Sequence, residues 1–269
     1  MSDPFSEELA VAREACEAAA ALIRQIGPDH IVAKPDGSPV TAADLRANEI
    51  ILATLARSFP DDGVLSEEST DSQARLQKPR VWIVDPLDGT RDFVHGTGQY
   101  AVHVGLAVQG KATLGVVAEP AACRVSWAVR GQGAFVSESG ERPQRLAVSK
   151  MATFSDFRIG TTRYAMSPAV QAFLSAEPPL AGIPMGASTK LMALARAELE
   201  ACVWLSAAEK EWDTCAPEVI VEEAGGCLTD ALGHPFVYNK RDVVHRLGIV
   251  ASHGLDHVSL LARAARFFP

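Results

Sequence analysis

Apolar side chains at helical spacing near the start of the chain predict two helices. Residues 6 to 26 carry them three or four positions apart, and a glycine–proline pair ends the pattern. A second helix is expected from near Thr41, an N-cap candidate with Asp44 three residues further on, to about Arg57. The segment between the helices, residues 34 to 39, has the proline, aspartate and glycine of a turn. This pattern puts Asp44 in the first turn of a helix.

The pattern then changes to that of strands. Val81-Trp-Ile-Val84 is a short buried-strand signal, and we expect it to end at Asp85-Pro86, because proline cannot donate to a central ladder. Further strand-like runs, separated by turns that contain glycine, lie at 100–108, 112–118, 123–129 and 133–136. Such a succession of short strands predicts an antiparallel sheet.

The second half alternates between the two element types. The expected order is a strand at 157–161, a helix at 188–199, a strand at 201–205, a helix at 214–224, and strands at 227–229 and 247–251. The chain is therefore predicted to be α/β (α+β), a layered sandwich of two tightly packed subdomains, with a soft boundary near Lys150. Residues 1–150 would bind metal, and residues 151–269 would complete the active site.

Composition and charge narrow the possible partners. The chain of 269 residues carries a formal net charge of -8 and no basic run, which excludes a nucleic acid polymer as the expected partner. Its five cysteines are odd in number and show no CxxC pair, so a reduced compartment is expected. The acidic start lacks an apolar signal core, and no run approaches the ~18 apolar residues that span a bilayer. We therefore expect a cytoplasmic protein with no membrane partner.

Carboxylates gather at places where the predicted elements begin or end. Glu67 and Glu68 follow a turn, Asp85 and Asp88 end a strand, and Asp213 and Asp44 begin helices. Pro86 and Gly89 allow a turn that folds Asp85, Asp88 and the Leu87 carbonyl toward one point, and Gly89-Thr90 amides could hold an anionic oxygen if they open a helix. Oxygen ligands of this kind suit Mg²⁺.

Other interpretations of these carboxylates remain open. Asp85 and Asp88 could simply shape a turn, Glu67-Glu68 could be a solvated loop, and Asp44 and Asp213 could be helix caps. An aspartyl-phosphate hydrolase is disfavoured, because its D-x-D-G-T motif spaces the aspartates by two residues and has no proline between them. An EF-hand is disfavoured too, because no loop with alternating oxygen ligands fits this segment.

Taken together, these motifs resemble the magnesium-dependent, lithium-sensitive phosphatase superfamily that includes inositol monophosphatase, fructose-1,6-bisphosphatase and 3'(2'),5'-bisphosphate nucleotidase. The resemblance covers nearly the whole chain, from about Glu14 to Ser252. The matching stretches are Ser-Pro-Val-Thr41-Ala-Ala-Asp44, Leu-Ser-Glu67-Glu68, Trp-Ile-Val-Asp85-Pro-Leu-Asp88-Gly-Thr90, Glu211-Trp-Asp213-Thr-Cys-Ala-Pro and Glu223-Ala-Gly-Gly226. The resemblance implies an αβαβα sandwich of the inositol monophosphatase and fructose-1,6-bisphosphatase type.

The resemblance also implies a site. Glu67, Asp85 and the Leu87 carbonyl would hold one Mg²⁺ and Asp85, Asp88 and Asp213 another, within a set of about two or three ions per active site. Thr90 would orient a metal-activated water, Asp44 would accept the Thr90 hydroxyl proton, and Glu67 would assist catalysis. The implied substrate-binding residues are Glu67, Leu87, Asp88, Gly89, Thr90, Arg163, Ser188, Lys190 and Asp213. Of these, Arg163 and Lys190 are the candidates for a second phosphate.

Within the superfamily the chain looks most like the bisphosphate nucleotidases. The supporting stretches are Thr90-Arg-Asp-Phe93, Glu211-Trp-Asp-Thr-Cys-Ala-Pro-Glu-Val-Ile220 and Tyr238-Asn-Lys-Arg-Asp242. Ser206 stands where inositol phosphatases more often carry a glutamate, which speaks against an inositol hydroxyl ligand. The loop Gly186-Ala-Ser-Thr-Lys190 departs from the nucleotidases, which often have a second serine there.

The expected function is hydrolysis of a small phosphate ester, the 3'-phosphate of adenosine 3',5'-bisphosphate, to AMP and phosphate. An inositol monophosphatase or a sugar (bis)phosphatase on the same scaffold is the alternative, and a catalytically idle metal or nucleotide sensor is the alternative outside enzymes. The resemblance also implies lithium inhibition and a possible homodimer.

Overall fold

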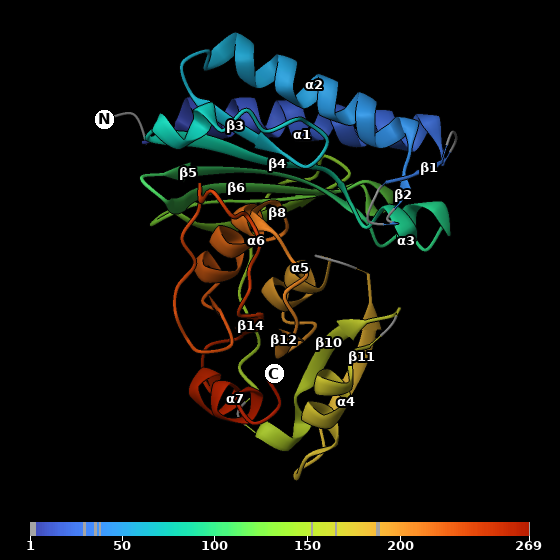
Figure 1. The fold of residues 1–269 in the computed structure, drawn as a ribbon, viewed down its shortest axis with the longest axis vertical. Helices are drawn as coiled ribbons and strands as arrows, with labels where there is room; N and C mark the ends of the chain where they lie inside the picture. The colour runs from blue at the N-terminus through green and yellow to red at the C-terminus, as the bar shows by residue number, and fades with distance from the viewer. Residues whose placement is uncertain are drawn as a thin grey trace.

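The computed structural model describes residues 4–28, 31–34, 37, 39–151, 153–164, 166–186 and 189–268. Helices and sheets alternate through it as helix, sheet, helix, sheet and helix layers (Figure 1). The predicted α/β layered sandwich is therefore confirmed. The predicted boundary near Lys150 between subdomains 1–150 and 151–269 stays a prediction.

The first three layers surround a large sheet. Helices α1 (Ser6–Ile26) and α2 (Ala42–Ser58) cover one face of it. The sheet runs in the order β3-β4-β5-β6-β7-β8-β9, and only its β3–β4 pair is parallel among the described residues. Its strands are β3 (Gly63–Ser66), β4 (Arg80–Asp88), β5 (Ala101–Val108), β6 (Lys111–Glu119), β7 (Arg124–Val129), β8 (Gly133–Glu138) and β9 (Gln144–Arg145).

A second sheet lies beyond a middle layer of helices. Helices α5 (Thr189–Ala195) and α6 (Glu211–Glu223) separate the two sheets (Figure 1), and α4 (Pro168–Ser175) and α7 (His257–Ala264) pack on the far face of the second sheet. Its order is β11-β10-β12-β14-β13. The strands are β10 (Arg158–Thr162), β11 (Ala181–Met185), β12 (Ala201–Trp204), β13 (Cys227–Thr229) and β14 (Ile249–Ser252).

Successive side chains of a strand are buried on opposite faces of the sheet, and this alternation produces the layers. In β4, Trp82 and Val84 are buried against α1 and α2, whereas Val81 and Ile83 belong to the core shared with α5 and α6. Cys202 of β12 belongs to that same core, while its neighbour Val203 packs with α4 and α7. Both sheets are therefore covered on two faces, as neighbouring side chains of a strand point in opposite directions.

Two predicted ends are wrong. Strand β4 does not stop before Pro86 but continues to Asp88, and the register of its pairing with β5 shifts between Asp85 and Asp88. The irregularity accommodates a residue without an N–H group. Helix α5 ends at Ala195 instead of 199, because Ala197 takes a left-handed backbone and Glu198 N–H closes the end on the Ala193 carbonyl.

The sequence analysis also missed several elements. Helix α6 begins at Glu211, three positions before the predicted start. Strands β3 and β11 and helices α4 and α7 were not predicted. β11 is an edge strand that contains Gly182 and Pro184 and is mostly exposed, so neither propensity nor apolar alternation marks it.

Three short elements complete the part that carries the site. Strands β1 (Val32–Ala33) and β2 (Pro39–Val40) form a separate pair, and α3 (Thr90–Val94) follows β4 directly. In the described part of the chain, no helix combines the length and apolar character needed to cross a membrane.

Candidate functional site

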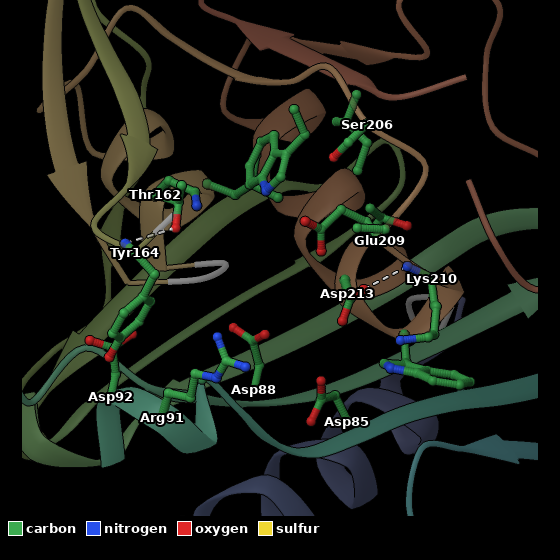
Figure 2. Close-up of a pocket in the computed structure, with 18 of the residues that line it drawn as sticks. Asp85, Asp88, Arg91, Asp92, Thr162, Tyr164, Ser206, Glu209, Lys210 and Asp213 are labelled. Carbon is green, nitrogen blue, oxygen red and sulfur yellow. Dashed lines mark hydrogen bonds between the residues drawn. The ribbon is translucent and has the colours of Figure 1, made fainter. Parts of the chain in front are cut away.

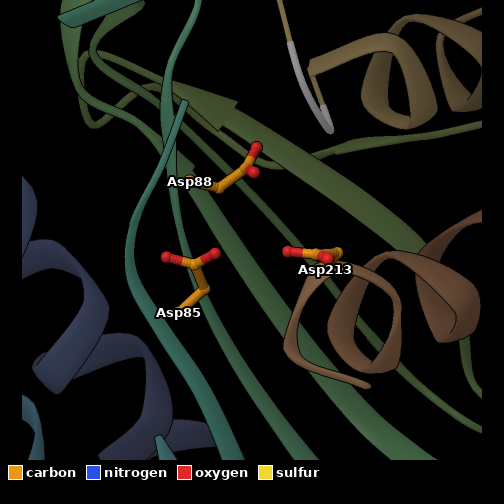
Figure 3. Close-up of side chains that lie close together, drawn as sticks. All are labelled: Asp85, Asp88 and Asp213. Carbon is orange, nitrogen blue, oxygen red and sulfur yellow. The ribbon is translucent and has the colours of Figure 1, made fainter. Parts of the chain in front are cut away.

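Three aspartates from two distant segments converge where β4 ends. Asp85, Asp88 and Asp213 each offer a carboxylate oxygen within 4.8 Å of the others. Figure 3 shows the three side chains around a common space, Asp85 and Asp88 from the end of β4 and Asp213 from the start of α6. Leu87 N–H donates to Asp85 Oδ1 at 3.0 Å, and Lys210 N–H donates to Asp213 Oδ2 at 2.6 Å. These backbone contacts fix how the carboxylates point.

The electrostatics of this cluster are unfavourable without a cation. Burial raises the pKa of Asp85 well above its usual value, and the charges of Glu67, Asp88 and Asp213 raise it further. Burial and the neighbouring carboxylates raise the pKa of Asp213 in the same way. The donors are all oxygens, with no sulfur or imidazole in the cluster, and hard divalent cations prefer such donors. The cluster therefore can bind a metal ion.

Glu67 and Glu68 lie beside this cluster and share a lysine. Glu67 N–H donates to the Val84 carbonyl at 3.2 Å, which anchors the residue next to β4. Lys34 Nζ donates to Glu67 Oε1 at 2.7 Å and also contacts the Glu68 carboxylate. Glu67 thus reaches the same site as the aspartates, with one oxygen already paired to an ammonium group.

Asp44 connects α2 to the end of β4. Its Oδ1 accepts a hydrogen bond of 2.9 Å from the Thr90 hydroxyl, and its Oδ2 accepts from Thr41 N–H at 2.8 Å and from the Thr41 hydroxyl at 2.5 Å. Helix capping and contact with Thr90 therefore coexist in one side chain, which is buried. The Thr90 hydroxyl also lies 3.2 Å from the Leu87 carbonyl oxygen. Gly89, with φ of 83°, caps α3, so Gly89-Thr90 does open a helix.

The three aspartates, Glu67, Leu87, Gly89 and Thr90 line one cavity of about 460 Å³. Figure 2 shows Asp213 facing Asp85 and Asp88, with Arg91 between Asp88 and Asp92 and with Tyr164 next to Asp92. Its lining includes Glu67, Asp85, Leu87, Asp88, Gly89, Thr90, Arg91, Asp92, Tyr164, Lys190, Trp204, Ser206, Glu209, Lys210 and Asp213. An acidic floor and a wall with cations and aromatic rings would suit an anionic ligand that brings a metal ion.

Lys190 is the buried cation of this cavity. Its side chain is enclosed, and its Nζ lies 4.5 Å from the centre of the Trp204 ring. Burial lowers the pKa of Lys190, while the charges of Glu209 and Asp88 act in the opposite direction. An enclosed ammonium with an open side toward a cavity can bind an anion strongly, because little water competes there.

Arg163 does not line the cavity. Its guanidinium pairs with Asp92, Nε to Oδ1 at 3.3 Å, and donates to Gln99 Oε1. Asp92 itself lines the cavity and is buried. Ser188, expected in the substrate site, lies outside the described residues.

The comparisons agree with this geometry. The model of the inositol monophosphatase family matches residues 5–265. The chain belongs to the inositol monophosphatase family. It is 35% identical over 238 residues to a histidinol-phosphatase of Mycobacterium tuberculosis, with 86% of each chain covered. It is 30% identical over 211 residues to the 3'(2'),5'-bisphosphate nucleotidase CysQ of Aggregatibacter actinomycetemcomitans, with 78% of each covered.

Solved structures give the same answer. The extragenic suppressor protein suhB of Bartonella henselae superposes with a TM-score of 0.81 at 28% identity, covering 96% of this chain and 98% of that one. CysQ of Bacteroides thetaiotaomicron superposes with a TM-score of 0.79 at 26% identity, covering 93% and 98%. The protein is a phosphatase of the inositol monophosphatase family, and the resemblance inferred from its motifs is confirmed.

Several polar residues of the site in this family member were not predicted from the sequence. Arg91, Asp92, Tyr164 and Glu209 line the cavity. Burial raises the pKa of Glu209, which lies close enough to Lys190 for their charges to interact. Arg91 and Asp92 stand directly after the metal motif, and Glu209 stands just before Glu211-Trp-Asp213, so adjacency to a motif was the available signal.

His103 is a further residue without a predicted role. It pairs with Asp85 across the β4–β5 ladder and is fully buried. Its Nδ1 lies 3.2 Å from the Trp212 carbonyl oxygen, and its Nε2 has no hydrogen-bond partner among the described residues. Burial lowers the pKa of His103, while the charge of Asp88 acts in the opposite direction.

Proposed function

We propose that this phosphatase is Mg²⁺-dependent and removes the 3'-phosphate from adenosine 3',5'-bisphosphate. The observation that carries the phosphatase chemistry is the convergence of Asp85, Asp88 and Asp213 next to the Thr90–Asp44 hydrogen bond. The narrower substrate assignment is supported by the cations Lys190 and Arg91 in the same cavity. It is supported as well by the similarity to relatives named as bisphosphate nucleotidases.

Asp85, Asp88 and Asp213 would hold Mg²⁺, with Glu67 and the Leu87 carbonyl as further ligands. This donor set fits the ion, because it consists of oxygens and because burial and the neighbouring carboxylates raise the pKa of Asp85. When bound, Mg²⁺ would activate water and neutralise charge that develops on the phosphate. Glu67 would have to share its carboxylate between this role and Lys34.

The protein's own residues would orient the reacting groups. The Thr90 hydroxyl donates to Asp44 Oδ1, which leaves a lone pair of the Thr90 oxygen to accept a hydrogen bond from the attacking water. As Thr90 took up the proton of the water, its own hydroxyl proton would pass to Asp44. Asp44 is in turn fixed by two hydrogen bonds from Thr41. The proton acceptor is therefore positioned before substrate arrives, and no protein nucleophile is needed.

The far end of the cavity would receive the rest of the nucleotide. Lys190 and Arg91 would bind the 5'-phosphate, and the rings of Tyr164 and Trp204 offer flat apolar surfaces to a base. Arg163, the earlier candidate, has its guanidinium engaged by Asp92 and Gln99. Ser206 contributes no charge toward a sugar or inositol hydroxyl.

Histidinol phosphate is the second candidate. Besides Glu67, the lining carboxylates outside the aspartate cluster are Asp92 and Glu209, and these two could receive an ammonium group. A relative named as a histidinol-phosphatase is 35% identical to this chain. Because Asp92 pairs with Arg163, Glu209 would be the main acceptor for the ammonium group of histidinol phosphate. This makes histidinol phosphate the weaker candidate.

Phosphate release from a panel of esters tests both candidates. The panel contains adenosine 3',5'-bisphosphate, adenosine 3'-monophosphate, L-histidinol phosphate and inositol 1-phosphate, each with Mg²⁺ and with chelator. We expect the highest kcat/KM for the bisphosphate and no release with chelator. A higher kcat/KM for histidinol phosphate or inositol 1-phosphate contradicts the nucleotide assignment, and undiminished hydrolysis by Asp88→Asn would support an idle sensor instead.

A further inference from the structure

We propose that Asp92, Arg163 and Gln99 form a latch that positions Lys190 and so sets the affinity for the second anionic group of the substrate. The role of Lys190 in this inference rests on the proposed function. The latch itself is defined by contacts between the end of β4 and the second sheet. Its members are positioning residues, since they act through Lys190.

Asp92 is the buried end of the latch. It lies in α3, two residues after Thr90, and its side chain is only 2% exposed. Its Oδ1 accepts a hydrogen bond of 2.7 Å from the Thr97 hydroxyl and pairs with Arg163 Nε at 3.3 Å. A buried carboxylate is costly unless it is paired, so Asp92 constrains where the Arg163 guanidinium lies.

Arg163 transmits this constraint to Gln99. Arg163 follows β10, and its backbone N–H donates to the Met185 carbonyl at the end of β11. Its guanidinium donates to Gln99 Oε1, and the same oxygen accepts a hydrogen bond of 2.6 Å from Gly186 N–H. One amide oxygen therefore joins the arginine to the first residue after β11.

Gly186 connects the latch to Lys190. The Thr189 hydroxyl donates to the Gly186 carbonyl at 2.8 Å, and Thr189 is the first residue of α5, immediately before Lys190. Gly186 also packs against Gln99 so closely that a Cβ at this position would lie 2.7 Å from Gln99 Cβ. Gly186, whose carbonyl accepts from the first residue of α5, is thus held against Gln99 before β5.

Lys190 is where this arrangement has its effect. The ammonium is enclosed against Trp204 and lines the same cavity as Asp92. The latch residues come from both halves of the chain, 92 and 99 from the first and 163 from the second. Loss of the Asp92–Arg163 pair would free Gln99 and Gly186 together, and the ammonium would then sample more positions. Binding of the second anion would weaken while the aspartate cluster stayed in place.

The kinetic test uses two substrates that differ only in the second phosphate. For Arg163→Met, KM for adenosine 3',5'-bisphosphate should rise about 10-fold, with kcat within about twofold. KM for adenosine 3'-monophosphate should not change. Arg57→Met, which removes the exposed pair with Glu14, is the matched control and should match the parent protein with both substrates.

A double-mutant cycle separates positioning from direct contact. If the latch acts through Lys190, adding Arg163→Met to Lys190→Met should raise KM for the bisphosphate no further. Additive effects of Arg163→Met and Lys190→Met would mean that Arg163 itself touches the substrate, and would overturn the inference. An equal loss of kcat/KM with both substrates would also overturn it, because it would indicate a merely structural role.

Amine labelling of Lys190 gives a readout that needs no substrate. Brief acylation with mass-spectrometric detection should leave Lys190 protected in the parent protein and modify it several-fold faster in Asp92→Asn and Arg163→Met, with Lys111 as the exposed internal standard. If both variants are labelled faster but the parent protein prefers histidinol phosphate in the ester panel, the latch is upheld and the nucleotide assignment is rejected. Unchanged labelling in both variants rejects the latch whatever the substrate.

Discussion

The Thr90 hydroxyl donates a hydrogen bond of 2.9 Å to Asp44, a residue 46 positions away in the chain. The bond joins the first turn of α2 to the helix that follows the aspartates of β4. It also joins two of the sequence motifs directly. Asp44 is a cap residue and a hydrogen-bond acceptor for Thr90 at once, so the two interpretations of it were not alternatives.

Removing this hydrogen bond should slow turnover without loss of metal affinity. In Thr90→Val the water loses its proton acceptor, and in Asp44→Asn the amide can donate to Thr90 instead of accepting from it. We expect kcat to fall by about 10²-fold or more in both, with Mg²⁺ binding by calorimetry unchanged. Thr113→Val removes a turn hydroxyl bonded to the Lys111 carbonyl and serves as the control. Normal kcat in Thr90→Val would rule out its proposed role.

Neutralising one aspartate of the cluster should change stability in opposite directions with and without metal. Asp85→Asn removes a buried charge from among like charges, so in chelator the variant should melt a few degrees higher than the parent, at about 2–4 °C per kcal/mol for a chain of this size. In Mg²⁺ the parent should gain about 2.7 kcal/mol at 100 times Kd, and the variant much less. Thermal melts in both buffers measure this. Asp61 is exposed, so Asp61→Asn should show neither effect. If Mg²⁺ stabilised Asp85→Asn as much as it stabilises the parent, the assignment of Asp85 as a ligand would be contradicted.

The packing of α6 on the first sheet should be intolerant of one extra methyl group. A Cβ on Gly115 of β6 would lie 2.8 Å from the Ala216 Cα and closer still to the Ala216 carbonyl. Both obstacles are backbone, so α6 would have to move, and Gly115→Ala should cost about 1–3 kcal/mol in urea unfolding. At Gly182 of β11 the added methyl meets only the end of the Leu174 side chain at 2.8 Å, which can rotate away. Equal losses at the two positions would show that α6 is not held as described.

Glu218 should make the protein less stable as pH rises. It lies in α6, accepts a hydrogen bond of 2.5 Å from the Tyr238 hydroxyl, and has its pKa raised by burial to about 8. Between the ordinary carboxyl pKa and 8, the unfolded chain has lost this proton and the folded protein retains it. The contribution of Glu218 to the free energy of unfolding is therefore fully present below the ordinary pKa. It falls by up to about 1.4 kcal/mol per pH unit until the folded group also ionises.

Chemical unfolding of Glu218→Gln from pH 5 to 9 isolates this contribution. The variant cannot ionise at this position, so its advantage over the parent should grow between pH 5 and 8 and then level off. Exposed Glu14→Gln should run parallel to the parent. Parallel curves for Glu218→Gln and the parent would mean that Glu218 is charged in the folded state.

Local pattern was sufficient for much of the fold. The helix pattern at 6–26 and the capping signal of Thr41 with Asp44 predicted α1 and α2, and the glycine-separated apolar runs predicted β5 to β8. In these elements the apolar residues recur with the period of a helix or of a strand and form one buried face. The side-chain pattern therefore agrees with the tertiary packing. Edge strand β11 is mostly exposed, lacks such a face and was missed. Helix α7 was missed although it buries Leu260 and Ala264.

The chain's residue order determined which groups could do chemistry here: oxygen donors after a strand, a threonine beside them, and a glutamate and an aspartate in separate motifs. Tertiary structure decided which of them meet. It brought Asp213 to Asp85 and Asp88, buried Lys190 in the same cavity, and tied Arg163 to Asp92 and away from the lining. The spacing of residues along the chain limits only which neighbouring side chains can reach one another. The pairing of buried charges depends instead on how layers formed from distant segments stack. The stacking follows from the burial of all the apolar faces together.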